Sequence, residues 1–364
     1  MTATGPRNGT GAVDVVALGE SMVAFRPSRP GRLADVPSFE RGIGGAESNA
    51  ACVLAAAGHS VRWVSRVGAD GFGDHLVAAI GSWGVDVGAV GRDPDRPTGV
   101  YFRTAGDRAT DAHEVAYYRA GSAASAMSPD TVDTAALRAC RVLHLSGITA
   151  ALSAGCLRLL RELTAPGPGR PLISFDVNFR PALWRDADGP RVLLELARRA
   201  DLVFVGDDEA RAAWGLRGGR AISDALPEPG TVVVKQGAGG ATAFTRDTAA
   251  SEDGRDDRDC LGDGVATHVT APAVDVVAHV GAGDAFAAGF LSATLRRLPV
   301  RDRLRHGHLA AAAALTVPGD LAPPPERGHA DRLAALDDAA WGRLRLGPGW
   351  TRTARRADEE GATP

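Results

Sequence analysis

Short apolar segments of strand length recur along the chain, separated by segments with the periodicity of helices. Apolar runs typical of buried strands occur at 13–18, 142–145, 172–177, 202–205 and 232–235. Ala-rich or amphipathic segments, each predicted to be a helix, lie at 46–57, 153–163, 191–199, 208–214, 285–298 and 303–317. Strands that alternate with helices in this way predict βαβ units and a mainly parallel sheet.

The pattern is less uniform in the first third of the chain. Residues 61–67 alternate between apolar and polar side chains like a strand, and 74–83 is predicted to be a helix. Two further strand-like segments, 100–104 and 113–119, flank the turn-rich segment 105–112 and predict a hairpin.

Three segments are predicted to lie outside the folded part. Residues 246–264 are acidic and contain glycine, which is typical of a surface insertion. Residues 1–12 and 346–364 are polar, and we expect them to be flexible termini. No shift in composition divides the remainder, so we expect one domain over about 13–340.

The composition excludes several classes of protein. The chain has 364 residues, 45% of them apolar and 23% charged, which is enough for a sizeable core. Its formal net charge of -3 argues against a dedicated nucleic-acid binder. The longest apolar stretch, 308–317, is too short for a bilayer, which requires about 20 residues, and the first residues lack the apolar segment of a signal peptide. We therefore expect a cytoplasmic protein with no nucleic-acid or membrane partner.

The lysine, cysteine and histidine residues argue against several further kinds of site. Lys235 is the only lysine, and Gln236 follows it, whereas a P-loop needs Ser or Thr after its lysine. The four cysteines are scattered without a C-x-x-C pair, which argues against a disulfide framework, a zinc site and a redox pair. The histidines form no convincing metal set.

The sharpest candidate for chemistry is the segment V-G-A-G-D at 280–284, which runs directly into an Ala-rich helix. Gly281, Ala282 and Gly283 let the backbone approach a ligand, and the helix N-terminus presents free N–H groups. Together these groups predict an anion hole suited to a phosphoryl group in transfer. Asp284 lies at its edge, where a carboxylate can accept a proton from an attacking hydroxyl. The alternative is that Asp284 only stabilises the helix N-terminus.

A second glycine-rich turn runs into a helix at 41–49. Gly44 and Gly45 would let a ligand lie against the backbone, and the amide of Asn49 can both donate to and accept from a polyol. A tight structural turn is the alternative interpretation of the same residues.

Three further segments follow or end predicted strands. The segment D-V-N-F-R-P at 176–181 could line the crevice at the carboxyl edge of an open α/β sheet. Tyr117 and Arg119 could hold an anionic substrate through charge-assisted hydrogen bonds. The segment K-Q-G-A-G-G at 235–240 suits a nucleotide. Solvated loops and ordinary turns remain the alternatives for all three.

In this order, the motifs resemble those of the ribokinase-like (PfkB) carbohydrate kinases. The G-G-x-x-x-N start at 44–49 is similar to the family's first signature, G-A-G-D at 281–284 is similar to its second, and V-G-A-D-G-F-G at 67–73 also fits. Within the family, the segments G-G-A-E-S-N, Y-Y-R-A-G-S-A at 117–123 and D-V-N-F-R-P-A-L-W at 176–184 most resemble 2-keto-3-deoxygluconate kinases.

The resemblance covers about 13 to 336 and implies a ribokinase-like α/β three-layer sandwich. In it, a mainly parallel sheet lies between helices on both faces, and a small β-lid, here from about 30–41 and 100–119, covers the sugar site. It implies transfer of the γ-phosphate of ATP, with Mg²⁺, to the terminal hydroxyl of a sugar acid. Lids in this family often pair, so a homodimer through the lid is a further expectation.

The resemblance also assigns the site residues. Asp284 would be the base, and the backbone of Gly281, Ala282 and Gly283 would form the anion hole. The other residues implied are, for the sugar, Gly44, Gly45, Asn49, Tyr117, Arg119 and Arg180; for the nucleotide, Asn178, Lys235, Gly237, Gly240 and His308; and for Mg²⁺ through water, Glu209.

The sequence departs from the family pattern on the nucleotide side. Ala278 and His279 stand where the family usually carries Asp-Thr or Asp-Pro, which bears on activation by a monovalent cation. Gly206 replaces the Asn of the family's N-x-x-E, and His308 stands where Asn is common. Weaker ATP binding, an altered phosphate donor and an inactive member of the family are the alternatives that follow.

Two other functions stand beside a sugar-acid kinase. Because one fold accepts many sugars, a kinase for fructose, ribose or 5-dehydro-2-deoxygluconate is the first. A non-catalytic regulator that binds a sugar or a nucleotide is the second. A Rossmann dehydrogenase is disfavoured, because no G-x-G-x-x-G follows the first predicted strand.

Overall fold

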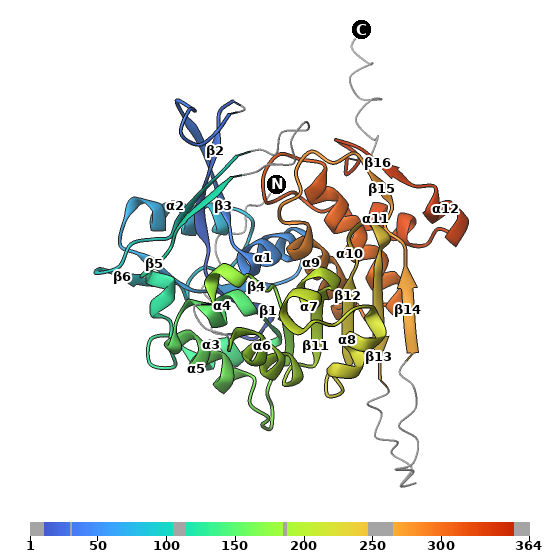
Figure 1. Cartoon of the computed structure of the whole chain (residues 1–364), viewed down its shortest axis with the longest axis horizontal. Helices are drawn as coiled ribbons and strands as arrows, with labels where there is room; N and C mark the ends of the chain where they lie inside the picture. Colours follow the sequence, from blue (N-terminus) through green and yellow to red (C-terminus); the bar gives the residue numbers. More distant parts are fainter. Residues whose placement is uncertain (1–10, 30, 105–113, 185–187, 247–264, 353–364) are drawn as a thin grey trace.

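An eight-stranded sheet lies at the centre of the computed structural model (Figure 1), which describes residues 11–29, 31–104, 114–184, 188–246 and 265–352. In spatial order, its strands are β14 (Val265–Val269), β13 (Ala241–Thr245), β12 (Thr231–Lys235), β11 (Leu202–Gly206), β10 (Leu172–Asp176), β9 (Cys140–Ser146), β1 (Val13–Leu18) and β4 (Val61–Val64). Neighbours from β12 to β4 pair in parallel, which confirms the predicted mainly parallel sheet. The antiparallel strands β13 and β14 were not predicted, because β13 is short and rich in Ala and Thr and only one face of β14 is apolar.

Helices connect most of these strands, and four helices, from 282 to 342, follow the last strand of the sheet. Each predicted helix is confirmed, with its ends shifted by three residues or fewer. One set contributes to the apolar cluster around α9: α1 (Ala46–Ala56), α2 (Gly71–Gly81), α9 (Ala282–Leu295), α10 (Val300–Leu315), α11 (Arg327–Ala334) and α12 (Asp338–Gly342). The other set contributes to a second cluster: α3 (Thr134–Arg138), α4 (Gly147–Leu152), α5 (Ala154–Leu163), α6 (Gly189–Arg198), α7 (Asp207–Trp214) and α8 (Gly219–Ala225).

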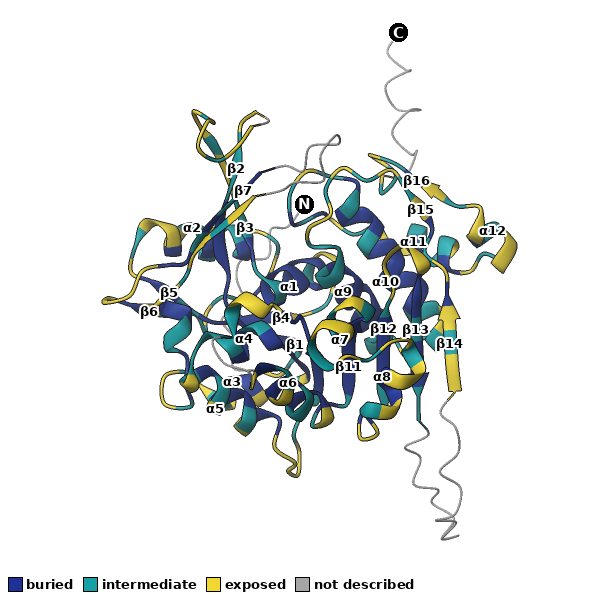
Figure 2. Cartoon of the chain, in the orientation of Figure 1, coloured by how far each residue is buried: buried dark blue, intermediate teal, exposed yellow. Residues whose placement is uncertain are grey.

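The two clusters lie on opposite faces of the sheet. Val15 and Ala17 of β1 belong to the cluster around α9, whereas Val16 and Leu18 belong to the other. Successive side chains of a strand point to opposite faces, so strands that are apolar throughout must be covered on both sides. In Figure 2 the parallel strands at the centre of the sheet are mostly buried, whereas the edge strand β14 is mostly exposed.

A second, four-stranded sheet projects from the body at the upper left of Figure 1. Its strands, in spatial order, are β3 (Phe39–Gly44), β2 (Met22–Pro27), β7 (Val100–Arg103) and β8 (Val115–Tyr118). The sequence predicts a lid from 30–41 and 100–119, and the structure adds β2 as an interior strand of this lid sheet. Aromatic rings cover one face, where the ring of Phe25 stacks on that of Phe102 with centroids 4.8 Å apart. Two short strand pairs complete the described chain: β5 (Arg66–Gly68) with β6 (Gly91–Asp93), and β15 (Ala273–Val274) with β16 (Arg345–Leu346).

The C-terminal boundary differs from the prediction. The sequence predicts a flexible tail from residue 346, but Leu346 is 5% exposed in β16 and Trp350 packs against the cluster around α9. Burial of these apolar side chains offsets the cost of ordering an otherwise polar segment. Residues 1–10, 247–264 and 353–364, which include most of the predicted insertion, lie outside the described residues. Within the described part of the chain, no helix has the length and apolar character needed to cross a membrane.

Candidate functional site

Asp284 lies in the first turn of α9, beside the carboxyl ends of the parallel strands. Gly281, the residue before the helix, has φ 77°, a conformation that side chains disfavour. A Cβ atom at this position would lie 2.0 Å from the carbonyl oxygen of Asp320. Conformation and space therefore both require glycine here. The turn fixes where α9 begins, and with it the free N–H groups of Ala282, Gly283 and Asp284.

The N-terminal turn of α1 meets the N-terminal turn of α9. Asn49 Nδ2 donates a hydrogen bond to Asp284 Oδ2 over 2.9 Å. A Cβ on Gly44 would lie 2.2 Å from the hydroxyl oxygen of Tyr101, and one on Gly45 would lie 2.3 Å from the backbone after β1. The structure thus brings Asn49 to the predicted base, whereas Gly44 and Gly45 meet a packing need and their contact with a sugar stays a prediction.

The carboxyl group of Asp284 is poised to exchange a proton near neutral pH. Burial raises its pKa to about 7, although the hydrogen bond from Asn49 opposes the shift. Repulsion from Asp176 raises this pKa further, and attraction to Lys235 and Arg180 lowers it. A general base is most effective when its pKa lies near the working pH. The surroundings of Asp284 therefore suit proton transfer better than those of an exposed carboxylate.

Lys235 ends β12 and pairs with Asp176 at the end of β10. Its Nζ lies 2.9 and 3.1 Å from the two carboxylate oxygens of Asp176, whose side chain is 3% exposed. Burial acts to lower the pKa of Lys235, but attraction to Asp176 and Glu209 outweighs it and raises the pKa. A Cβ on Gly283 would lie 3.6 Å from Nζ. A permanent positive charge therefore lies beside the predicted anion hole.

Other predicted nucleotide contacts lie in turns that follow β10 and β12. Gly237 has φ 56°, begins the short turn η3 (Gly237–Gly239) and has open space where a Cβ would be. Gly240 has φ 111°, and a Cβ there would lie 2.2 Å from the carbonyl oxygen of Val269. Asn178 has φ 40°, and its side-chain oxygen is buried with no partner in the described chain. Gly240 meets a packing need, whereas Gly237 has open space beside it. Asn178 is buried, and its role at the nucleotide stays a prediction.

His308 lies inside the helical layer. It is 6% exposed, its Nε2 is 3.1 Å from the carbonyl oxygen of Val269, and its ring centroid is 5.2 Å from that of Phe286. Burial lowers its pKa to about 4, so the ring is neutral at pH 7. These contacts give His308 a packing role, and its predicted role at the nucleotide stays a prediction.

Arg180 and Glu209, predicted for the sugar and for Mg²⁺, contact each other. Arg180 donates to Glu209 Oε1 over 3.2 Å, and the backbone N–H of Gly206 donates to Oε2 over 2.9 Å. The side chain of Arg180 is 52% exposed, so it can leave this pair at little cost. The described residues contain no group of three or more His, Cys, Asp or Glu able to hold a metal. The role of Glu209 at Mg²⁺ stays a prediction.

Arg119 is held by a buried carboxylate. Its guanidinium forms an ion pair with Glu20, whose side chain is 1% exposed, and the hydroxyl of Ser122 donates to the same carboxylate over 2.5 Å. Tyr117 is 55% exposed, and its ring centre lies 5.9 Å from the guanidinium carbon of Arg119. With residues of α4 and α5, these two line a cleft of about 810 Å³. The described lining of this cleft does not include Asp284.

The segment before the anion hole is tied to the end of α10 through its backbone. The N–H groups of Val277 and Ala278 both donate to the carbonyl of Leu315, over 2.7 and 3.3 Å. His279 is exposed. Ala278 and His279, where the sequence departs from the family pattern, have no carboxylate. Their effect on activation by a monovalent cation stays a prediction.

Three buried carboxylates hold groups near the site: Asp176, predicted only as part of the crevice-lining segment 176–181, and Glu20 and Glu47, to which the sequence assigned no role. Asp176 holds Lys235, and Glu20 holds Arg119. Glu47 on α1 accepts hydrogen bonds of 2.7 Å from two buried hydroxyl groups. Each of the three is an acid within an apolar or glycine-rich segment. An acid in such a segment is expected to be buried and therefore paired, so this position could have predicted their role.

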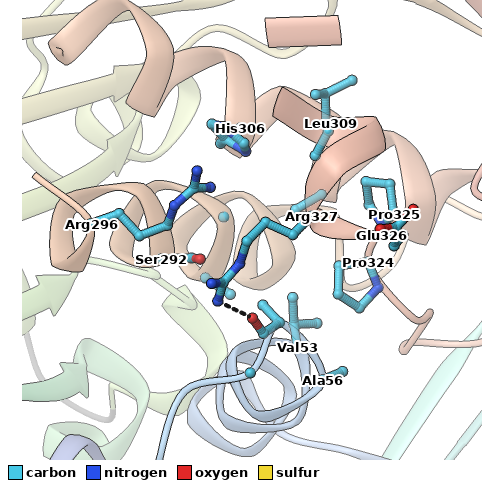
Figure 3. Close-up of a pocket in the computed structure, with 16 residues that line it drawn as sticks. Val53, Ala56, Ser292, Arg296, His306, Leu309, Pro324, Pro325, Glu326 and Arg327 are labelled. Carbon is cyan, nitrogen blue, oxygen red and sulfur yellow. Dashed lines mark hydrogen bonds between the residues drawn. The ribbon is translucent and has the colours of Figure 1, made fainter. Parts of the chain in front are cut away.

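A further cavity of about 320 Å³ lies between the C-terminal ends of α1 and α9 and the helices α10 and α11 (Figure 3). Its guanidinium groups are engaged: Arg327 donates to the carbonyl of Ala57 over 2.9 Å, and Arg296 donates to both carboxylate oxygens of Asp331 over 2.8 Å. Arg327 thus binds a free carbonyl at the end of α1, and Arg296 pairs with Asp331. The cavity takes no part in the site around Asp284.

Comparisons with known proteins agree with the motifs and the fold. Residues 13–327 match the family described as pfkB family carbohydrate kinase. The chain belongs to this family. This carbohydrate kinase is 33% identical to a 2-dehydro-3-deoxygluconokinase of Bacillus subtilis (strain 168) over 333 residues, which make up 89% of this chain and 95% of that protein.

Solved structures share the architecture of this carbohydrate kinase. The PfkB protein from Polaromonas sp. JS666 is 32% identical, with a TM-score of 0.74 over 88% of this chain and 99% of that chain. A putative ribokinase II from E. coli, solved in complex with ATP and Mg²⁺, is 22% identical, with a TM-score of 0.75 over 88% of this chain and 98% of that chain. The predicted ribokinase-like α/β fold is confirmed.

Proposed function

We propose that this carbohydrate kinase transfers the γ-phosphate of ATP to the terminal hydroxyl of a sugar acid, 2-keto-3-deoxygluconate, with Asp284 as the general base. The observation that carries the proposal is the position of Asp284, in the first turn of α9 and within hydrogen-bond distance of Asn49. Its pKa of about 7 lets it act as a proton acceptor near neutral pH.

The transfer uses groups of α1 and α9. The carboxylate of Asp284 accepts the proton of the sugar hydroxyl while the hydroxyl oxygen attacks the γ-phosphorus. The bond from that phosphorus to the β–γ bridging oxygen breaks, and ADP leaves. Asn49 orients the carboxylate through its hydrogen bond of 2.9 Å. The free N–H groups at the start of α9 stabilise the charge on the phosphoryl oxygens.

The residues at the carboxyl edge of the sheet fit a triphosphate. The charged ammonium of Lys235 lies beside Gly283, where it would attract phosphate oxygens as a point charge. Open space at Gly237 would accept more of the nucleotide. The E. coli relative was solved with ATP and Mg²⁺, which supports the same donor here. Mg²⁺ would neutralise phosphate charge, held mainly by phosphates and water, with Glu209 as the candidate carboxylate of this chain.

Support for an acidic sugar comes from Arg180 and from the relative in Bacillus. The guanidinium of Arg180 is half-exposed and can turn from Glu209 to a sugar carboxylate, exchanging one charge-assisted contact for another. The Bacillus protein is named for 2-dehydro-3-deoxygluconate, which is another name for 2-keto-3-deoxygluconate. Both observations favour a sugar acid over a neutral hexose.

A neutral sugar such as fructose or ribose is the second candidate, and one observation favours it. Arg119 already pairs with Glu20, and Arg180 already pairs with Glu209. A neutral sugar would leave both ion pairs intact, whereas a carboxylate must compete with Glu209 for Arg180.

A panel of sugars decides between the two. The purified protein is assayed for ADP release with ATP, Mg²⁺ and either 2-keto-3-deoxygluconate, fructose or ribose. We expect kcat/KM to be at least about tenfold higher for the sugar acid, as for a site that pairs with a charged group. Arg180→Ala should raise KM for the sugar acid and leave KM for a neutral sugar unchanged. A higher kcat/KM for fructose or ribose would favour the second candidate, and sugar binding without ADP release would favour a regulator.

A further inference from the structure

Asp320 lies where the lid sheet meets the central body, in the segment between α10 and α11. It is 8% exposed, and both oxygens of its carboxylate are bound by side chains of β7. The hydroxyl of Tyr101 donates to Oδ2 over 2.5 Å, and the guanidinium of Arg103 donates to Oδ1 over 2.5 Å. A buried carboxylate held at both oxygens has one available orientation, so Asp320 and β7 are held together firmly.

The backbone of the same residue lies against the anion hole. A Cβ on Gly281 would lie 2.0 Å from the carbonyl oxygen and 2.9 Å from the carbonyl carbon of Asp320. Gly281 precedes α9 and sets the direction of the turn that ends in Asp284. Any displacement of the Asp320 backbone toward Gly281 must therefore move that turn, because close-packed interiors have no free space to absorb it.

The glycine-rich turn between β3 and α1, predicted to contact the sugar, meets the same group of atoms. A Cβ on Gly44 would lie 2.2 Å from the hydroxyl oxygen of Tyr101 and 2.8 Å from Oδ2 of Asp320. Gly44 ends β3 in the lid sheet and immediately precedes Gly45 and α1. Asp320 is thus in contact range of β7, of the end of β3 that leads into α1, and of the anion hole, three segments that are far apart in the sequence.

We infer that Asp320 is a positioning residue that couples the lid sheet to the anion hole. It makes the geometry of Gly281 and Asp284 depend on where β7 lies. This inference rests on the proposed function, because it concerns the base and the anion hole named there. When a sugar holds the lid sheet in place, Asp320 holds the anion hole in its productive form. Without the sugar, the anion hole is less well ordered, and transfer of phosphate to water is slow.

Two substitutions test the coupling, and a third serves as a matched control. Asp320→Asn keeps the size of the side chain but removes the charge that pairs with Arg103. Tyr101→Phe removes a single hydroxyl from the same contact. Phe102→Leu is the control: it alters the next residue of β7, which stacks on Phe25 on the opposite face and has no hydrogen bond to Asp320.

The first measurement is the ratio of ADP release without sugar to ADP release with saturating sugar. We expect Asp320→Asn to raise this ratio about tenfold and Tyr101→Phe to raise it less, in the range of energetic coupling between packed sites. KM for ATP should change less than about threefold, because no group that contacts the nucleotide is altered. Phe102→Leu should leave the ratio unchanged. An unchanged ratio in Asp320→Asn, or an equal rise in Phe102→Leu, would overturn the inference.

The second measurement does not require catalysis. Hydrogen exchange is followed at the backbone amides of 281–285 in the wild type, Tyr101→Phe and Phe102→Leu, at equal distances below each melting temperature. We expect faster exchange in Tyr101→Phe only, because Tyr101 reaches Gly281 through Asp320. Equal exchange in both variants would overturn the inference. If the wild type phosphorylates no sugar acid, the proposed function fails, but this experiment still decides whether β7 and the anion hole are coupled.

Discussion

The surroundings of Asp284 and those of Arg119 are built in different ways. Around Asp284, the geometry follows from the backbone, because Gly281 permits a turn that other residues disfavour and α9 begins directly after it. Around Arg119, the geometry follows from ion pairs between charged side chains of distant segments, such as Glu20. Geometry that depends on backbone conformation can be predicted from a short motif. Geometry that depends on ion pairs cannot, because the partner residues lie outside the motif.

The largest expected effect concerns Asp284. Asp284→Asn keeps the hydrogen-bonding size of the side chain but removes the proton acceptor. We expect kcat to fall by about 10²–10⁴-fold, the usual cost of losing a positioned acid–base group. Affinity for ATP, measured by calorimetry, should stay near that of the wild type, because the amides at the start of α9 and Lys235 remain in place.

Asn49→Ala provides the matched comparison for this prediction. It leaves the acceptor in place and removes only the hydrogen bond that orients it. A loss of about tenfold in kcat is expected, which is smaller than that of Asp284→Asn. A variant Asp284→Asn that retains more than half of the wild-type kcat would contradict the role of Asp284 as base.

The same contrast explains what the sequence predicts well. The alternation of apolar runs and helical segments predicts that the central strands pair in parallel with helices between them, and G-A-G-D predicts a glycine-rich turn into α9 with Asp284 at its start. Both depend on local rules of periodicity and backbone conformation. The contact between Asn49 and Asp284 could be expected only from the family resemblance, since it joins residues of two separate helices.

What the sequence does not predict is the pairing of charges. Arg119 and Arg180 are predicted to bind a sugar carboxylate, yet in the structure they form ion pairs with Glu20 and Glu209. The strand β2 was missed because its residues M-V-A-F-R-P lack a regular alternation of apolar and polar positions, and its pairing depends on β3 and β7. In each case the deciding partner is remote in the sequence.

The second prediction compares the two arginines directly. Arg119→Leu leaves Glu20 buried without its partner, and we expect the free energy of unfolding to fall by about 3–5 kcal/mol. Arg180→Leu removes a half-exposed arginine, and Glu209 keeps its hydrogen bond from the backbone N–H of Gly206, so the loss should be less than about 1 kcal/mol. Urea unfolding followed by fluorescence measures both. Equal losses would show that the difference in burial between the two pairs does not affect the free energy of unfolding.

A double variant separates the charge from the packing of Arg119. Combining Arg119→Leu with Glu20→Gln removes both charges of the buried pair at once. We expect most of the lost stability to return, because an apolar and a neutral residue no longer leave a buried charge without a partner. If the double variant is no more stable than Arg119→Leu, the loss comes from the packing of the arginine side chain and not from its charge.

A smaller effect than that of Arg119→Leu is expected for the dependence of stability on pH at Asp284. Burial raises its pKa from 3.8 to about 7 in the folded protein. Between about pH 4 and 7, the folded protein therefore binds a proton that the unfolded chain has released, and stability falls as the pH rises. Because the side chain is partly exposed, we discount the full shift and expect a total loss of about 1–2 kcal/mol. Over the same range kcat/KM rises, because only the carboxylate accepts the proton of the sugar.

Asp284→Asn tests this opposition between stability and activity. Asparagine does not ionise, so the variant should match the wild type at pH 4.5 and exceed it by about 1–2 kcal/mol at pH 8, measured by urea unfolding at both values. A wild type that is the more stable protein at pH 8 would mean that the ionised carboxylate is favoured in the fold, as for an ordinary paired acid. The expected result means that burial of Asp284 serves the reaction at a cost to stability, as is common at active sites.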